Sequence, residues 1–216
     1  MGGHSRSIKG NRGRMTNMKP NMRLALIALA LAAAPAGAQK IGSDGEAFLT
    51  ALREGNGSKA VSLAEGKGST VINYRGDDGE SPLHIVIRKR NSNWIGFLLA
   101  NGADPNAADK NGDTPRLLAA RSGYGEGVAR VLMAGALVDK ANRLGETALI
   151  VAVQQRQAAI VSTLLKLGAN PDKTDHAAGY SARDYAKRDT RSRELLKLIE
   201  TVKSQKARIA PVAPAR

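Results

Sequence analysis

The sequence has no cysteine and only three histidines among its 216 residues, which removes two common kinds of functional site. Without cysteine, the chain can form neither disulfides nor thiolate nucleophiles. The histidines are His4, His84 and His176, and no two stand at the spacing of a metal-binding helix pair. A zinc site therefore has no ligand set, and no Ser-His-Asp arrangement can be built without His84. The composition predicts a protein that is not an enzyme and that needs no metal or cofactor.

Aromatic residues and long apolar runs are also scarce. Aromatics make up 3% of the chain and none lies in residues 204–216, so base stacking on single-stranded nucleic acid is not supported. The nonpolar run over residues 24–38 would form a helix about 22 Å long, which is shorter than the roughly 30 Å core of a bilayer. We therefore expect neither specific nucleic-acid binding nor a stable membrane span.

The N-terminus has the three-part order of a secretory signal peptide. Basic residues without a single acidic one precede the nonpolar run, and residues 35–38 end it with a small-x-small site. We predict a signal peptide over residues 1–38, cleaved after Ala38, and a periplasmic or secreted mature chain. Four methionines are alternative start positions: Met1, Met15, Met18 and Met22.

The positive charge is concentrated near the chain ends. The formal net charge is +14, and removal of residues 1–38 leaves 27 basic against 19 acidic residues. From Lys173 onward there are 11 basic and 5 acidic residues. A basic C-terminal region gives one functional alternative, namely electrostatic binding to a polyanion or to an anionic membrane surface.

Two landmarks recur together at a step of 33 residues. The first is the segment Gly-Glu-Ser-Pro-Leu-His and its variants, which begin at Gly79, Gly112 and Gly145. The second is a Gly-Ala pair followed closely by Asp or Asn, and it is found at three places: Gly102, Gly135 and Gly168. Because both landmarks advance in step, the unit is a structural repeat. A unit this short cannot bury its apolar face alone and must stack on its neighbours.

Local signals inside each unit predict a turn followed by two helices. Asp78-Gly79 and Asn111-Gly112 favour tight turns because glycine tolerates positive φ. Ser81, Thr114 and Thr147 stand where a helix N-cap is expected. The glycine of each Gly-Ala pair is the residue favoured just past a helix C-terminus.

The period, the T-P-L-H-like segment, the helix pair and the G-A-D-x-N segment together resemble the ankyrin repeat. The resemblance implies an all-α ankyrin-repeat solenoid of stacked helix-turn-helix units with β-hairpin finger loops. We expect the repeat domain over 46–202, with a polar leader over 39–45 and a disordered basic tail over 203–216. The units within it are a degenerate N-terminal cap (46–76), three repeats (77–107, 108–140 and 141–173) and a C-terminal cap (174–202).

Departures from the family pattern fall in the second and third units. Arg116 replaces the first core leucine of its unit, and Ala148 replaces proline. Leu117 and Ile150 stand where the first unit has His84, so both units lack the Thr–His hydrogen bond seen in such repeats. The resemblance then implies lower stability in these units and the same fold.

The resemblance also implies a non-enzymatic module, expected to be a monomer, that binds a protein through finger tips and a concave groove. The candidate tip residues are Asp78, Asn111 and Leu144. The candidate groove residues are at the ends of the inner helices: Arg88, Lys89, Arg121, Ser122, Gln154, Gln155 and Arg188. If this basic stripe acts in binding, it selects an acidic partner; the alternative is a solvated basic face.

Two further features receive structural interpretations. Residues 123–127 are rich in glycine but lack the preceding strand and the Lys-Ser/Thr of a phosphate loop, so we interpret them as a turn between helices. Trp94 begins the second helix of its unit, and we interpret it as packing between repeats rather than as an interface anchor.

Overall fold

A computed structural model describes residues 36–66 and 70–209, with side chains over 44–66 and 70–201. Most of the predicted signal peptide lies outside these residues. Contacts divide the chain into two units, residues 1–40 and 41–216, and the repeats lie in the second. None of the described helices combines the length and the apolar character needed to cross a bilayer.

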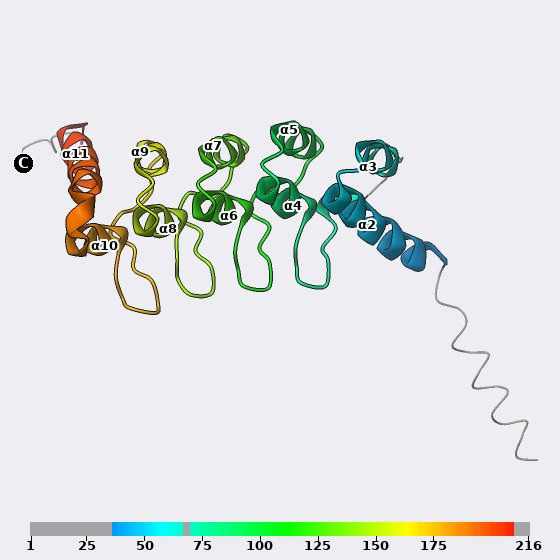
Figure 1. Ribbon diagram of the computed structural model, residues 1–216, viewed down its shortest axis with the longest axis horizontal. Coiled ribbons are helices and arrows are strands. Elements are labelled where there is room, and N and C mark those ends of the chain that lie inside the picture. The colour runs from blue at the N-terminus through cyan, green and yellow to red at the C-terminus, as the bar shows by residue number, and fades with distance from the viewer. Residues whose placement is uncertain (1–35, 67–69, 210–216) are drawn as a thin grey trace, which may run out of the picture. The chain divides into compact units, whose positions relative to one another are not determined.

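Ten helices are arranged as five consecutive pairs in the described part of the chain (Figure 1). The pairs, in chain order, are α2 (Ala36–Glu54) with α3 (Gly57–Ala64), α4 (Pro82–Arg88) with α5 (Ser92–Ala100), α6 (Pro115–Arg121) with α7 (Gly125–Met133), α8 (Ala148–Gln154) with α9 (Ala158–Lys166), and α10 (Ala182–Arg188) with α11 (Arg193–Ile209). Short 3₁₀ turns, η1 (Val71–Asn73) and η2 (Thr190–Ser192), precede α4 and α11.

The predicted caps set where the inner helices begin. Thr114 Oγ1 accepts from the backbone N–H of Leu117 at 3.3 Å, and Thr147 Oγ1 accepts from that of Ile150 at 3.2 Å. These bonds satisfy one of the N–H groups that a helix leaves unpaired at its start. The outer helix α5 ends before Gly102, whose φ of 81° stops the helix at no steric cost.

Apolar side chains of the inner and outer helices form one core that runs through the stack. Leu83, Leu117 and Leu149 are at most 1% exposed, and the outer-helix residues Ile95 and Val161 are fully buried beside them. Neighbouring inner helices α4, α6 and α8 lie side by side (Figure 1). Each unit thus buries its apolar face on the next one, as the repeat pattern predicts.

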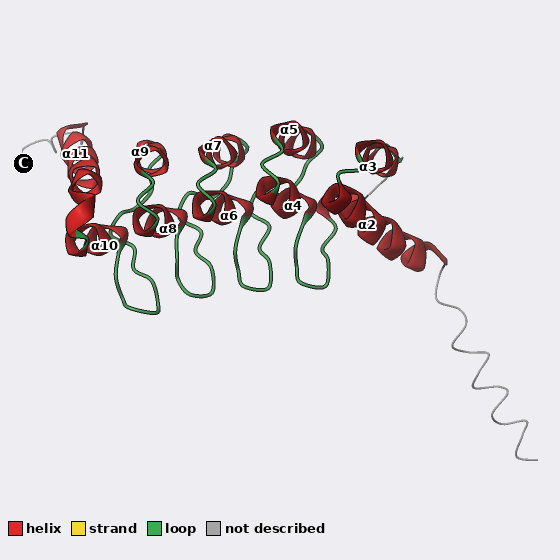
Figure 2. Cartoon of the chain, in the orientation of Figure 1, coloured by secondary structure: helices red, strands yellow, loops and turns green. Residues whose placement is uncertain are grey.

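The finger loops are tight turns that lack the two-stranded hairpins expected from the resemblance. The described residues contain no strand, and the one isolated bridge joins Thr174 and Ser181 (Figure 2). Each of the first three fingers is instead closed by two backbone bonds around one residue, such as Asp109 N–H to the Asp113 carbonyl at 3.0 Å and Gly112 N–H to the Asp109 carbonyl at 2.9 Å. One pair of residues is too little to form a ladder, so the fingers are hairpin-like turns only.

Two boundaries differ from those expected. Residues 39–45, predicted as a polar leader, lie within α2, and the predicted cleavage point after Ala38 falls in the first turn of that helix. At the other end, α11 continues to Ile209 and so includes the first half of the predicted tail. Helices anchored by buried residues, such as Leu195 and Ile199 in α11, gain one hydrogen bond for each residue added. Residues 210–216 lie outside the described residues.

Candidate functional site

The finger tips are tied together by one backbone hydrogen bond per repeat. The N–H groups of Lys110, Arg143 and His176 donate to the carbonyls of Asp78, Asn111 and Leu144, at 2.9, 3.0 and 2.8 Å. All three candidate tip residues therefore use their carbonyl oxygens within the protein while their side chains are exposed. Leu144 is 56% exposed, so one of these tips presents an apolar side chain to the solvent. The result is a row of tips in fixed register.

A polar side chain at the base of the second, third and fourth fingers holds the turn, whereas the first finger has Gly76 at this position. Asp109 Oδ1 accepts from the N–H groups of Asn111 and Asp113, and Asn142 Oδ1 accepts from those of Leu144 and Glu146. In the fourth finger the equivalent residue is Asp175, which accepts from two loop N–H groups and from the Tyr185 hydroxyl. Sequence reasoning missed these residues, although Asp109, Asn142 and Asp175 recur every 33 residues.

A row of carboxylates lies just before the inner helices. Glu80, Asp113 and Glu146 also recur every 33 residues, and the first two are only 4% and 7% exposed. The amide of Asn142 donates to both Asp113 and Glu146 at 2.8 Å and links two units. Sequence reasoning missed this row as well, although its spacing is visible in the repeat.

Two of the candidate groove arginines pair with this row. Arg88 lies 2.5 Å from Glu80, and Arg121 lies 3.3 Å from Asp113 and 3.1 Å from Glu146. Between residues 44 and 201 the sequence has 22 Lys and Arg against 19 Asp and Glu. The groove therefore carries arginines whose charge is locally compensated rather than a row of isolated cations.

The other groove candidates differ from one another. The Arg188 guanidinium lies 4.6 Å from the centre of the Tyr180 ring, a cation–π contact. Lys89, Ser122, Gln154 and Gln155 are exposed. Among the described residues, Lys89 has no ion pair.

Two arginines at the turns between inner and outer helices have left-handed backbones. Arg90 and Arg156 have φ of 54° and 55°, whereas the equivalent residues Gly55 and Gly123 are glycines. Arg156 donates to Asp189 of the next unit at 2.6 Å, and this bond holds the pKa of Asp189 well below its usual range. Arg90 contacts the next unit through the Ser122 carbonyl and the Tyr124 ring. A non-glycine residue in this region is strained, so these contacts must compensate the strain.

His84, the one histidine at the motif position, is fully buried, and both of its ring nitrogens are engaged. Its Nδ1 accepts from the Ser81 N–H at 3.2 Å, and its Nε2 donates to the Asp113 carbonyl at 2.9 Å in the tautomer that these contacts require. Burial lowers the pKa of His84, so the neutral ring is the folded form. His84 thus joins two units, which is a structural role.

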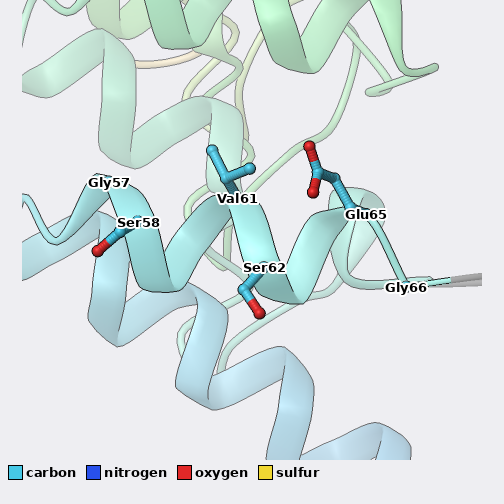
Figure 3. Close-up of a pocket in the computed structure, with 6 residues that line it drawn as sticks. All are labelled: Gly57, Ser58, Val61, Ser62, Glu65 and Gly66. Atoms are coloured by element: carbon cyan, nitrogen blue, oxygen red, sulfur yellow. The ribbon is translucent and has the colours of Figure 1, made fainter.

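A shallow depression on α3 is too open to be a site. Figure 3 shows that its lining comes from the single segment Gly57–Gly66, with Ser58, Val61, Ser62 and Glu65 spread along it. Ser58 is engaged with Asn56 at 3.1 Å, and none of the lining residues is buried. We assign no ligand to it.

The family is shown by comparison with known proteins. Residues 27–139 and 83–175 match the family described as ankyrin repeats (3 copies), and together the matches span more than half of the chain. The chain belongs to the ankyrin-repeat family. Ankyrin repeats are generally modules for protein–protein interaction and are typically non-enzymatic. No curated protein matches this chain.

Proposed function

We propose that this chain is an exported, non-enzymatic ankyrin-repeat scaffold that binds a protein partner through its finger tips and the adjoining groove. The observation that carries the proposal is the row of finger tips. Its backbone is fixed by a bond from each finger to the next, while the side chains of Asp78, Asn111 and Leu144 are exposed. A surface ordered before binding loses little entropy when a partner docks.

Arginines of the groove favour a partner with carboxylates. Arg88 and Arg121 are 63% and 44% exposed although each pairs with a buried carboxylate. A guanidinium has five N–H donors, so one ion pair leaves donors for a second acceptor. Because Glu80 and Asp113 fix the orientation of these guanidinium groups, an acidic partner meets donors that are already positioned.

Export follows from the basic, apolar and small-residue order of residues 1–38. We propose that the mature chain begins after Ala38 and lies in a periplasm or outside the cell. Cell fractionation with mass determination of the N-terminus tests this point. Recovery of the intact chain from the cytosol would contradict it.

Site-specific photo-crosslinking in cells tests the binding function. A photoreactive residue at Asn111 or Leu144 is expected to capture the same partner protein, which mass spectrometry then identifies. The control is the same residue at Lys166, which is exposed at the end of the outer helix α9. If the control captures that partner equally well, the finger tips are not the docking surface.

A second function, binding to an anionic membrane surface or polyanion, is favoured by one observation. Residues 44–201 are nearly balanced in charge, so the excess of positive charge lies mainly in flanking residues, including Lys203, Lys206, Arg208 and Arg216. Deletion of residues 204–216 should then reduce cosedimentation with phosphatidylglycerol vesicles at low salt. Unchanged cosedimentation would remove this alternative.

A further inference from the structure

The first junction of the stack contains a cavity of about 320 Å³ between the α2–α3 pair and the α4–α5 pair. Its floor comes from Ala51 and Leu52 of α2 and Val86 of α4, which are at most 4% exposed, and the partly buried Trp94 of α5 forms its accessible apolar wall. Lys89 is the only charged residue among the described residues that line it. The volume is at the small end of ligand sites and suits one or two side chains.

Equivalent junctions further along the stack are closed by side chains. At the second junction, Tyr124 is 8% exposed and packs against Gly127, with the Arg90 guanidinium 5.9 Å from its ring centre. At the third, Gln157 approaches Gly123, with its Nε2 only 3.3 Å from where a Cβ on that glycine would lie. At the fourth, Arg156 reaches Asp189.

Two residues differ from their equivalents in the next unit and leave the first junction open. Asn91 stands where the next unit has Tyr124, and its Oδ1 accepts from the N–H of Trp94 on its own helix at 3.1 Å. Gly55 stands where the next unit has Arg90, with the same left-handed backbone but no side chain. The cavity is therefore specific to this junction and follows from identifiable residues.

The aromatic wall of the cavity is held rigidly. Trp94 makes edge-to-face contacts with Phe48 at 6.2 Å and with Phe97 at 5.0 Å between ring centres. These are the only tryptophan and the only two phenylalanines of the chain. A ring fixed by two others presents apolar surface without losing rotamer freedom on binding, as anchor sites require.

We propose that this cavity is a socket for one apolar side chain of an acidic segment in a protein partner. The accessible face of Trp94 contacts the apolar side chain, and Lys89, which has no ion pair among the described residues, pairs with a neighbouring carboxylate. The helix N-termini of α3 and α5, capped by Asn56 and Asn91, flank the socket and add to its preference for negative charge. The proposal rests on the partner-binding function above and assigns it a specific anchor point.

Trp94 gives the socket its own reporter, because fluorescence from the only tryptophan comes from its wall. The probe is the acetylated peptide amide Gly-Glu-Leu-Asp-Gly, and the comparison peptide is Gly-Lys-Leu-Lys-Gly. We expect the acidic peptide to cause a saturable change in Trp94 fluorescence, with a Kd on the order of 1 mM because there is a single contact point. The basic peptide should bind at least about tenfold more weakly. No saturation, or equal affinity for both peptides, would overturn the proposal.

Three variants localise the binding. Asn91→Tyr introduces the residue that fills the second junction and should abolish the fluorescence change, while Lys89→Glu should weaken binding at least about tenfold. The matched control is Lys166→Glu, which makes the same charge change at the exposed end of the outer helix α9 and should bind as the parent does. Because Lys89 is exposed, Lys89→Glu should fold normally, so this variant remains decisive if Asn91→Tyr does not fold. Parent-like binding by Lys89→Glu would contradict the assignment.

Two outcomes distinguish a socket for an acidic partner from a different anchor point and from a contact between two copies of the chain. If crosslinks from Asn111 and Leu144 capture a partner equally well in Asn91→Tyr, the binding function stands and the socket is not its anchor. If sedimentation shows a dimer of the parent that Asn91→Tyr abolishes, a second copy of the chain occupies the cavity. That result would overturn the assignment to an acidic partner.

Discussion

The guanidinium of Arg116 donates to the backbone carbonyl of Leu137, and both residues depart from the repeat pattern. Where the other units have Asp104 and Asn170, whose side chains accept from the N–H two residues on, Leu137 offers no such acceptor. Arg116 also donates to the Lys140 carbonyl at 2.9 Å. Arg116 thus fixes the loop over residues 137–140 through its backbone carbonyls, where residue 137 has no side-chain acceptor to fix it.

Arg116→Leu should stabilise the protein. Arg116 is 1% exposed, its Nε has no hydrogen-bond partner among the described residues, and burial lowers its pKa to about 10, so it remains a buried cation at neutral pH. Leucine is the residue at this position in the first and third units. We expect the free energy of unfolding in urea to rise by about 1–3 kcal/mol. A fall instead would mean that the loop at Leu137 depends on the arginine.

Acid should destabilise the protein through His84. Its pKa is lowered in the folded state, chiefly by burial, so the unfolded chain binds the proton more readily. The contribution of the neutral His84 ring to the free energy of unfolding is then fully present above about pH 6.5, and it is lost as the pH falls below that value. The difference in unfolding free energy between the parent and His84→Gln should shrink from pH 7 to pH 5. A constant difference across that range would contradict the buried neutral ring.

The close approach of neighbouring fingers can be measured with two glycines. Gly112 and Gly102 both have φ of 81°, but a Cβ on Gly112 would lie 2.8 Å from the Arg143 nitrogen, whereas a Cβ on Gly102 would meet no described residue within 4 Å. Gly102→Ala should cost about 1 kcal/mol from backbone strain alone. Gly112→Ala should cost about 1–3 kcal/mol more, since the next finger must move. Equal losses in thermal unfolding would show that the fingers are not packed.

Charge reversal in the groove should act on stability before it acts on binding. Arg121→Glu places a carboxylate beside Asp113 and Glu146, so we expect a loss of about 2 kcal/mol or more. Arg121→Met removes the donor without adding repulsion, and should lose about half as much. Partner capture is therefore best compared between the parent and Arg121→Met. If Arg121→Glu and the parent have the same free energy of unfolding, the ion pairs of Arg121 do not contribute to stability.

The sequence predicts the repeat and its caps because these depend on local residues. Thr114 and Thr147 cap their helices as expected, and the glycines that end the units have positive φ. The ion pairs of Arg121 were not predictable, since its partners lie 8 and 25 residues away and the pairing depends on side-chain direction. The left-handed backbone of Arg90 was not predictable either, because no propensity places arginine at positive φ. The cavity arises from side chains that are too small to fill it.

Backbone hydrogen exchange at the finger tips tests most directly whether they form one ordered recognition surface. The amides of Lys110, Arg143 and His176 donate to the preceding finger, whereas the equivalent amide of Asp77 has no acceptor among the described residues. We predict that the first three exchange at least about tenfold more slowly than Asp77 after correction for intrinsic rates. If all four exchange equally fast, the tips move independently and the account of a fixed docking row is wrong.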